Sequence, residues 1–206
     1  MIFMSLAVAT MGTIFEYLMW TIDWWKPETI TGTKVGIEIF ILGFTNGGIG
    51  AVIYEFIKNK KIQSLNNNSR LVVFFNKYPF WIWLPFLTGI VLIITSYWIL
   101  GLHSFWATLI GTSFAIFLMI IIRHDLLVDS IIGGISMLII VIPVYVLLNN
   151  IFPEVIAKFW ILENFSGILI LKIPVEDLIF YFSSGMLIAP SYEYLFRKKL
   201  VRKSSS

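Results

Sequence analysis

The stretch Leu127–Phe152 reads LVDSIIGGISMLIIVIPVYVLLNNIF, and it decides the fold class. A helix needs about 20 mostly apolar residues to cross the hydrocarbon core of a bilayer, and this stretch is longer than that. Its single charged residue, Asp129, lies near one end. We therefore expect this stretch to be a transmembrane helix.

Composition favours a membrane protein throughout. Of the 206 residues, 58% are apolar and 13% are charged, which leaves too little polar surface to cover a soluble globule. The sequence predicts a single all-α membrane domain over residues 1–206, a polytopic bundle of about six transmembrane helices. The five further predicted spans are Ile2–Ile22, Val35–Ile57, Phe80–Leu100, Ser104–Arg123 and Ile173–Phe196. The segment Lys58–Tyr78 reads as the longest loop.

The basic residues predict the orientation in the membrane, because cytoplasmic loops are enriched in Lys and Arg. With six spans, eleven of the 15 basic residues fall on one side and four on the other. This split predicts that both termini are cytoplasmic. It also accounts for the net charge of +3, so no nucleic-acid partner is expected. Cysteine is absent, which excludes disulfides and thiolate chemistry.

The sequence also predicts an internal repeat, with copies at about 14–57 and 152–196. A shift of 138 residues aligns the second predicted span with the sixth, and an upstream Trp…Gly loop aligns after a small gap change. Each copy then reads as a loop followed by a helix with a carboxylate in its first turn. The aligned pairs are Trp25 with Trp160, Glu38 with Glu176, Gly47 with Gly185, and Tyr54-Glu55 with Tyr192-Glu193. A pseudo-twofold axis along the membrane normal would set the two first-turn acids facing each other.

Acids inside predicted spans are candidates for function, because a charge at bilayer depth costs about 2.5–3.5 kcal/mol on insertion scales. Glu176 and Asp177 open the last span behind Pro174, where a proline suits the first helical turn. They are adjacent and point about 100° apart, so at most one faces a given pocket. Glu16 lies two turns from its helix end. Glu55 and Glu193 lie near basic residues and are expected at the interface.

The segment Ile170–Phe182, ILKIPVEDLIFYF, resembles the Pro-x-Glu-Glu/Asp signature of the small membrane lycopene cyclases of archaea, actinobacteria and fungi. That family is also a tandem of helical repeats with a W-x-P…G loop before each signature, as in Trp25-Lys26-Pro27 and Gly32. The first copy differs, because it has Gly36-Ile37-Glu38-Ile39 without the proline or the second acid. The resemblance implies a redox-neutral cyclisation of linear carotenoid ends, with Glu176, Asp177 and Glu38 as the catalytic acids.

The residues suggest how such chemistry would run. An acid kept out of water beside a second acid favours its protonated form, so one of the three is expected to protonate a terminal alkene. A partner carboxylate would take a proton back after ring closure, so no cofactor and no metal are expected. Aromatic faces would stabilise the cation. The expected substrate contacts are Trp25, Trp160, Pro174, Phe180, Tyr181 and Phe182.

Other interpretations remain at this stage. A non-cyclising relative, either a hydratase or a carotenoid-binding protein, fits the altered first copy. A small transport or substrate-capture subunit fits the length and the topology. Asp125 and Asp129 share a helical face and could hold Mg²⁺ on a diphosphate. We favour a helix-start and salt-bridge role for them, because no second acidic motif accompanies them. The carotenoid used, the ring type and homo-oligomerisation are left open.

Overall fold

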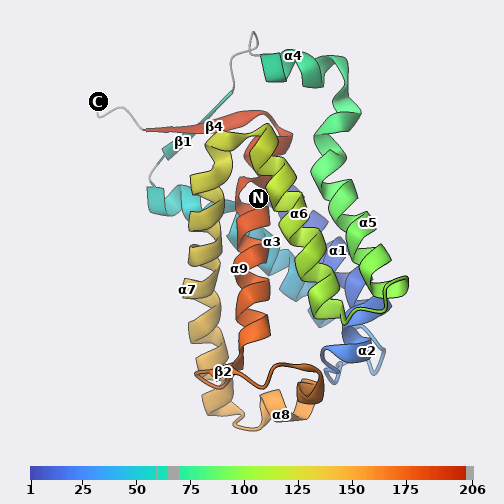
Figure 1. Cartoon of the computed structure of the whole chain (residues 1–206). Coiled ribbons are helices and arrows are strands. Elements are labelled where there is room, and N and C mark those ends of the chain that lie inside the picture. The colour runs from blue at the N-terminus through green and yellow to red at the C-terminus, as the bar shows by residue number, and fades with distance from the viewer. Residues whose placement is uncertain (59, 65–69, 203–206) are drawn as a thin grey trace.

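The computed structural model describes residues 1–58, 60–64 and 70–202. This part of the chain is almost entirely helical, which confirms the predicted all-α bundle (Figure 1). Its helices are α1 (Ile2–Phe15), the π-helical turn η1 (Glu16–Trp20), α2 (Thr21–Asp23), α3 (Ile37–Lys58), α4 (Arg70–Lys77), η2 (Pro79–Trp83), α5 (Leu84–Trp98), α6 (Ser104–Ile122), η3 (His124–Leu126), α7 (Leu127–Ile151), α8 (Val155–Phe159), η4 (Leu162–Asn164) and α9 (Val175–Leu195). Its strands are β1 (Lys60–Ser64), β2 (Leu169–Ile170), β3 (Ile173–Pro174) and β4 (Lys198–Arg202).

Three antiparallel helix pairs build the bundle, namely α1 with α3, α5 with α6, and α7 with α9. Glycines lie at each contact, where they allow two backbones to approach closely. An added β-carbon would lie 2.7 Å from the Met4 carbonyl oxygen at Gly47, 3.0 Å from the Gly111 carbonyl oxygen at Gly89, and 2.6 Å from the Gly133 carbonyl oxygen at Gly185.

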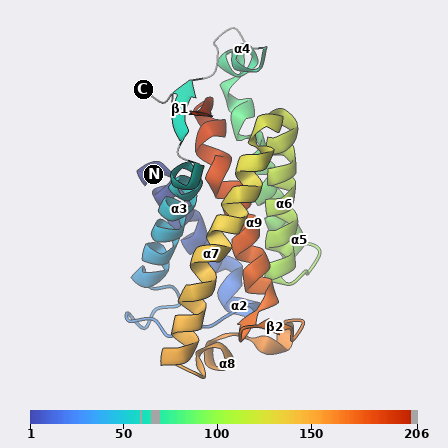
Figure 2. The same ribbon diagram turned by 90° about the vertical axis from the view of Figure 1, so that its left-hand side faces the viewer.

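Helix α9 lies at the centre of the bundle. It contacts α3 and α6 in addition to its partner α7. Figure 2 shows α9 behind α7, with α3 on one flank and α5 and α6 on the other. A central helix is in contact with several others, so the side chains at its start meet residues from distant parts of the chain.

Four helical segments in the described part of the chain are long and apolar enough to cross a membrane. They are Ile2–Asp23, Pro79–Trp98, Ser104–Ile122 and His124–Ile151. Helix α3 contributes a shorter apolar stretch, Ile37–Ile53. Helix α9 is long enough, but it carries Glu176, Asp177 and Glu193. The chain is therefore a membrane protein by these criteria, and six spans stay a prediction.

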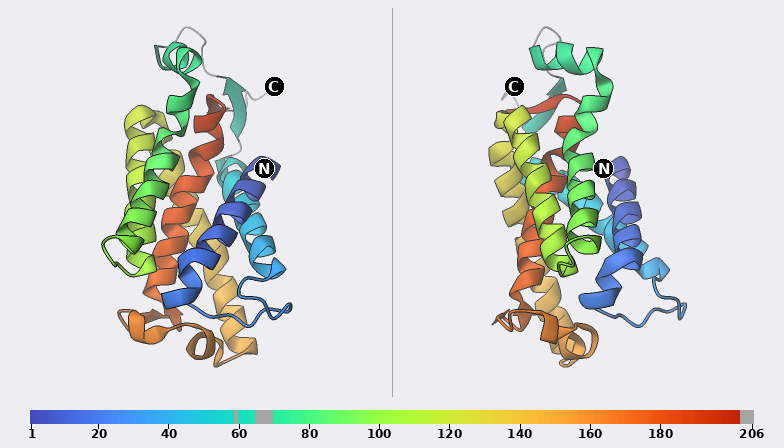
Figure 3. Two further views of the ribbon diagram at one scale, coloured as in Figure 1. Left: turned by 90° about the vertical axis from the view of Figure 1, so that its right-hand side faces the viewer. Right: turned by 45° about the vertical axis from the view of Figure 1, so that its right-hand side comes forward.

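The N-terminus and β4, the last described strand, lie toward the end of the molecule that carries α4 and β1, whereas α2, α8 and β2 lie at the opposite end (Figure 3). This placement is what an even number of spans requires. The cytoplasmic location of the termini stays a prediction from the basic residues.

The segment expected to be one long loop contains structure. Residues Lys60–Ser64 form β1, which pairs antiparallel with β4, and Arg70–Lys77 form helix α4. Val73 and Phe74 of α4 are exposed, whereas Phe75 is buried against the bundle. The prediction of a loop was wrong for these residues because a short amphipathic helix has too few residues to give a strong periodic signal.

Asp125, just before α7, makes the salt bridge expected for it. The Arg123 guanidinium donates to both carboxylate oxygens of Asp125, at 2.8 and 2.7 Å, and also to the Glu193 carbonyl oxygen at 3.3 Å. Glu193 is fully buried within the bundle at this end of α9, and its expected depth at the membrane interface stays a prediction. The Glu55 side chain lies outside the described residues.

Candidate functional site

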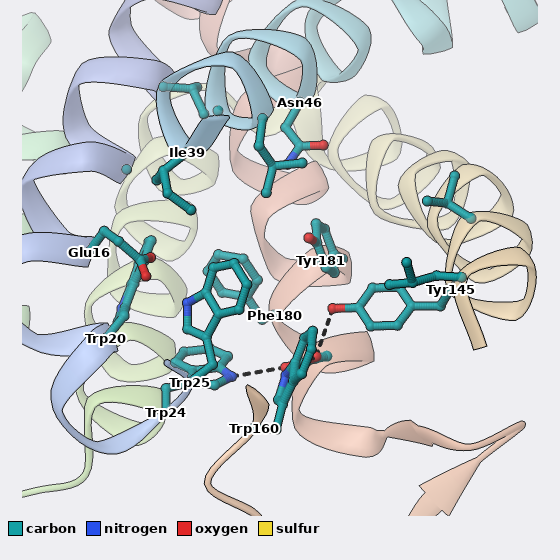
Figure 4. A pocket seen from close by; sticks show the side chains of 17 residues that line it. Glu16, Trp20, Trp24, Trp25, Ile39, Asn46, Tyr145, Trp160, Phe180 and Tyr181 are labelled. Carbon is teal, nitrogen blue, oxygen red and sulfur yellow. Dashed lines mark hydrogen bonds between the residues drawn. The ribbon is translucent and has the colours of Figure 1, made fainter. Parts of the chain in front are cut away.

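A cavity of about 280 Å³ lies between α1, α3, α7 and α9, at the end of the bundle where the α9 helix begins. Its wall is mainly apolar and aromatic. Four tryptophans line it, namely Trp20, Trp24, Trp25 and Trp160. The polar residues on the wall are Glu16, Asn46, Tyr145, Asp177 and Tyr181 (Figure 4).

Among these polar groups, the Asp177 carboxylate accepts three hydrogen bonds from side chains. Its Oδ1 accepts a hydrogen bond from the Trp24 indole at 2.9 Å. Its Oδ2 accepts from the Tyr145 hydroxyl and from the Trp160 indole, both at 2.7 Å. The Asp177 side chain is only 3% exposed. Three donors from three separate segments therefore hold one carboxylate at the cavity wall.

The residues just before α9 fix where this helix begins, and with it the position of Asp177 in its first turn. Strands β2 and β3 form a tight hairpin, whose turn residues Leu171 and Lys172 have φ of 53° and 62°. Paired positive φ values are typical of the two-residue turn that suits the twist of a hairpin. The hairpin leads directly into Pro174, which precedes the first turn of α9 with φ of −56°. The chain thus enters α9 in one defined direction.

The donors to Asp177 are held by contacts of their own. Trp25 and Trp160 pair in an antiparallel backbone bridge, and their rings lie 5.4 Å apart. Next to Trp24, the Asp23 carboxylate accepts a hydrogen bond from the Ser104 backbone N–H at 2.9 Å, which ties α2 to the start of α6. The cavity wall is therefore built from residues that are far apart in the sequence.

Aromatic rings cover the cavity next to the carboxylate. Phe180 packs edge-on against Trp20 and Trp24, with ring centroids 5.5 and 5.2 Å apart. The ring centroids of Tyr181 and Tyr145 lie 6.1 Å apart. A cation within about 6 Å of such ring faces is stabilised by their quadrupoles. The cavity thus offers a buried anion and several aromatic faces to a developing positive charge.

The structure brings together five of the nine residues expected to form the site. Asp177, Trp25, Trp160, Phe180 and Tyr181 all line the cavity. The prediction that at most one of the two adjacent acids faces a pocket is confirmed.

The other four expected site residues do not line the cavity. Glu176 accepts a hydrogen bond from the Ser166 backbone N–H at 2.8 Å, and Glu38 accepts one from the Ile30 N–H at 2.9 Å. Each of these carboxylates binds a backbone N–H group of the loop before its own helix. The two acids therefore do not meet in the cavity. Pro174 starts α9, and Phe182 packs against Gly134.

The two expected repeat copies have matching contacts. Each loop tied by Glu38 or Glu176 contains a glycine with positive φ, 66° at Gly32 and 77° at Gly167. Ile39, which aligns with Asp177, lines the same cavity. The first copy therefore contributes an apolar residue where the second contributes the carboxylate.

Sequence reasoning did not place Glu16, Trp24, Tyr145 or Asn46 at the site. Glu16 carried a signal, because an acid so far inside an apolar helix is costly. The side chain is 2% exposed and lines the cavity opposite Tyr145 and Trp160 (Figure 4). Trp24, Tyr145 and Asn46 carried no signal, since each is an ordinary residue for a membrane helix or its end.

Comparison with known proteins finds a similarity over the segment that supplies Asp177. The family model described as Lycopene cyclase matches residues 103–195, somewhat under half of the chain. Over this segment, the chain is similar to the lycopene cyclase family. No curated protein and no solved structure matches significantly.

The matched segment, 103–195, contains α6, α7 and α9. It therefore includes Asp177 and two of its hydrogen-bond donors, Tyr145 and Trp160. The resemblance of the signature in α9 is thereby confirmed. The match supports a carotenoid-cyclase type of function in general. The remaining wall, with Glu16, Trp24 and Trp25, comes from the part of the chain before this segment.

Proposed function

We propose that the chain cyclises a linear end group of lycopene or a related carotenoid, by redox-neutral acid chemistry within the bilayer. The observation that carries the proposal is the Asp177 carboxylate, held by three donors at the wall of an aromatic cavity. A buried, fixed carboxylate is suited to stabilise a positive charge that develops beside it, because the surrounding low dielectric strengthens the attraction.

The position of the cavity suits a substrate dissolved in lipid. Leu42 of α3 and Val144 of α7 line the cavity, and they are also 44% and 58% exposed on the outer surface of the bundle. The cavity therefore reaches the surface between these two helices, where lipid would surround the protein. A long apolar polyene can pass there without crossing water.

The size of the cavity suits one end of such a molecule. Pockets that enclose whole drug-sized ligands measure about 300–1,000 Å³. The cavity here, at about 280 Å³, lies below that range. We therefore place the end group inside, against the aromatic wall, and the remaining polyene outside between α3 and α7.

The reaction needs only proton transfers. A proton adds to the terminal double bond and leaves a tertiary cation, and the next double bond in reach closes onto this cation to form the ring. A neighbouring C–H bond then releases its proton, and its electrons form the new double bond. Asp177 stabilises the cation and accepts the released proton, so substrate and product have the same atoms.

The test is to express the chain in bacteria that accumulate lycopene and to analyse their pigments by chromatography. The wild-type chain should produce cyclic carotenoid. Asp177→Asn should reduce it by about 10²–10³-fold, the usual effect of removing an electrostatic stabiliser. Glu28→Gln is the matched control, because Glu28 is an exposed acid at the same end of the molecule, and it should leave the product unchanged.

Three other outcomes would overturn the cyclase proposal. Unchanged lycopene bound to folded protein would indicate a carotenoid-binding relative. A hydroxylated acyclic pigment would indicate a hydratase. Unchanged and unbound lycopene would remove this substrate.

A further inference from the structure

Glu16 is a second buried carboxyl group on the cavity wall, and the mechanism above gives it no role. Glu16 is the first residue of η1, directly after α1, whereas Asp177 lies in α9. Trp25 lies beside Glu16 on the cavity wall (Figure 4). Its Oε1 is buried and has no hydrogen-bond partner in the part of the chain that the structure describes.

The backbone at Glu16 departs from a regular helix in a way that serves the cavity. Val8, Gly12, Glu16, Trp20 and Trp24 all line the cavity, at intervals of four residues. In an α-helix, each step of four residues overshoots a full turn by about 40°, so this row would turn away from the cavity. The wider π-helical turn over Glu16–Trp20 offsets that rotation. Such turns occur frequently at functional sites.

The two carboxyl groups have different hydrogen-bonding surroundings. Both oxygens of Asp177 accept hydrogen bonds, and two of its three partners are indole N–H groups, which cannot accept one in return. This set of donors fits an ionised carboxylate, which can accept hydrogen bonds but cannot donate one. The free Oε1 of Glu16 fits a carboxylic acid, whose proton has no competing acceptor among the described residues.

We infer that Glu16 is the proton donor of the reaction and that Asp177 is its ionised partner. This inference rests on the proposed cyclase function. The Glu16 O–H bond breaks as its proton forms a C–H bond with the terminal alkene, and Glu16 becomes a carboxylate. After ring closure, Asp177 takes the proton that leaves the ring. Return of one proton from Asp177 to Glu16, with exchange through solvent, restores the site.

Solvent deuterium tests this assignment directly. Membranes holding the protein are equilibrated in D₂O, lycopene is added, and the pigment is analysed by mass spectrometry after a single turnover. The wild-type protein should add one deuterium per ring. Glu16→Gln should lower this labelling by at least about 100-fold, because general acids contribute about 10²–10⁴-fold. Glu16→Asp keeps an acid and should retain measurable labelling.

The outcomes separate this inference from the cyclase proposal. If the wild-type protein cyclises and Glu16→Gln labels its product at a rate near wild type, the assignment of Glu16 is overturned. Loss of labelling in both Glu16→Gln and Glu16→Asp, with both proteins folded, would indicate a structural side chain and would also overturn it. Should Glu16→Gln not be recovered folded, Glu16→Leu replaces it with the same expectation. A wild-type protein that forms no ring would contradict both proposals.

Discussion

Two adjacent acids at the start of α9 have different surroundings. Asp177 points into the cavity and meets three donors, whereas Glu176 points away and holds the Ser166 backbone N–H. The rotation of about 100° between neighbours on a helix accounts for this difference. The sequence motif names both residues, and only the fold separates the cavity acid from the acid that closes a loop.

At the residue scale, Tyr145→Phe tests how far the donors to Asp177 matter. The substitution removes one hydrogen bond at 2.7 Å and leaves both indole donors. A hydrogen bond to a charged group contributes about 1.5–3 kcal/mol, so we expect a lower cyclisation rate and a lower melting temperature in a protein that still folds. Tyr17→Phe is the control, because Tyr17 is exposed. A Tyr145→Phe protein with wild-type turnover would show that this donor is dispensable.

At the element scale, close helix contacts depend on glycine. Gly133 and Gly185 join α7 to α9, so they also set the position of Tyr145 relative to Asp177. Gly43 and Gly47 have the same role between α3 and α1. The cavity lies between these two helix pairs, and its shape therefore depends on how closely each pair packs.

Gly185→Ala should destabilise the protein by about 1–3 kcal/mol, the usual cost of overpacking. The new β-carbon would lie 2.6 Å from the Gly133 carbonyl oxygen, so α7 and α9 would have to separate. Gly12→Ala is the matched control, because nothing lies within 4 Å of its added β-carbon. That control should be neutral or more stable. Thermal unfolding in detergent measures both, and equal melting temperatures would contradict the packing account.

The sequence predicted the helical elements better than the site. Long apolar stretches identified the main helices, because lipid requires apolar side chains over a fixed length. The contacts of Tyr145, Trp24 and Glu16 depend on how distant helices pack, which no local pattern encodes. Phe182 was expected in the cavity by proximity to Asp177, but its position on α9 turns it toward Gly134.

At the scale of the whole molecule, the two predicted repeat copies, 14–57 and 152–196, both contribute to the cavity wall, and only the second copy supplies the signature acid. Asp177 comes from the second copy, whereas the aligned residue of the first copy is Ile39. Glu16, from the first copy, lies across the cavity. The site is therefore asymmetric, although the loops and helices around it match.

Access between α3 and α7 can be tested by narrowing it. Val144→Trp places a large ring at the rim of the cavity and should lower the cyclisation rate without changing the melting temperature. Leu147→Trp is the matched control, because Leu147 is exposed on the same helix but does not line the cavity. Equal rates for the two variants would contradict access by this route.

The central claim is that Asp177, in its aromatic cavity, supports a redox-neutral ring closure. The most direct measurement uses purified protein in liposomes, with lycopene as the only pigment, followed by chromatography and mass determination of the product. The account predicts a cyclic isomer with the mass of lycopene from the wild-type protein and almost none from Asp177→Asn. A product of different mass, or ring formation by folded Asp177→Asn at the wild-type rate, would contradict it.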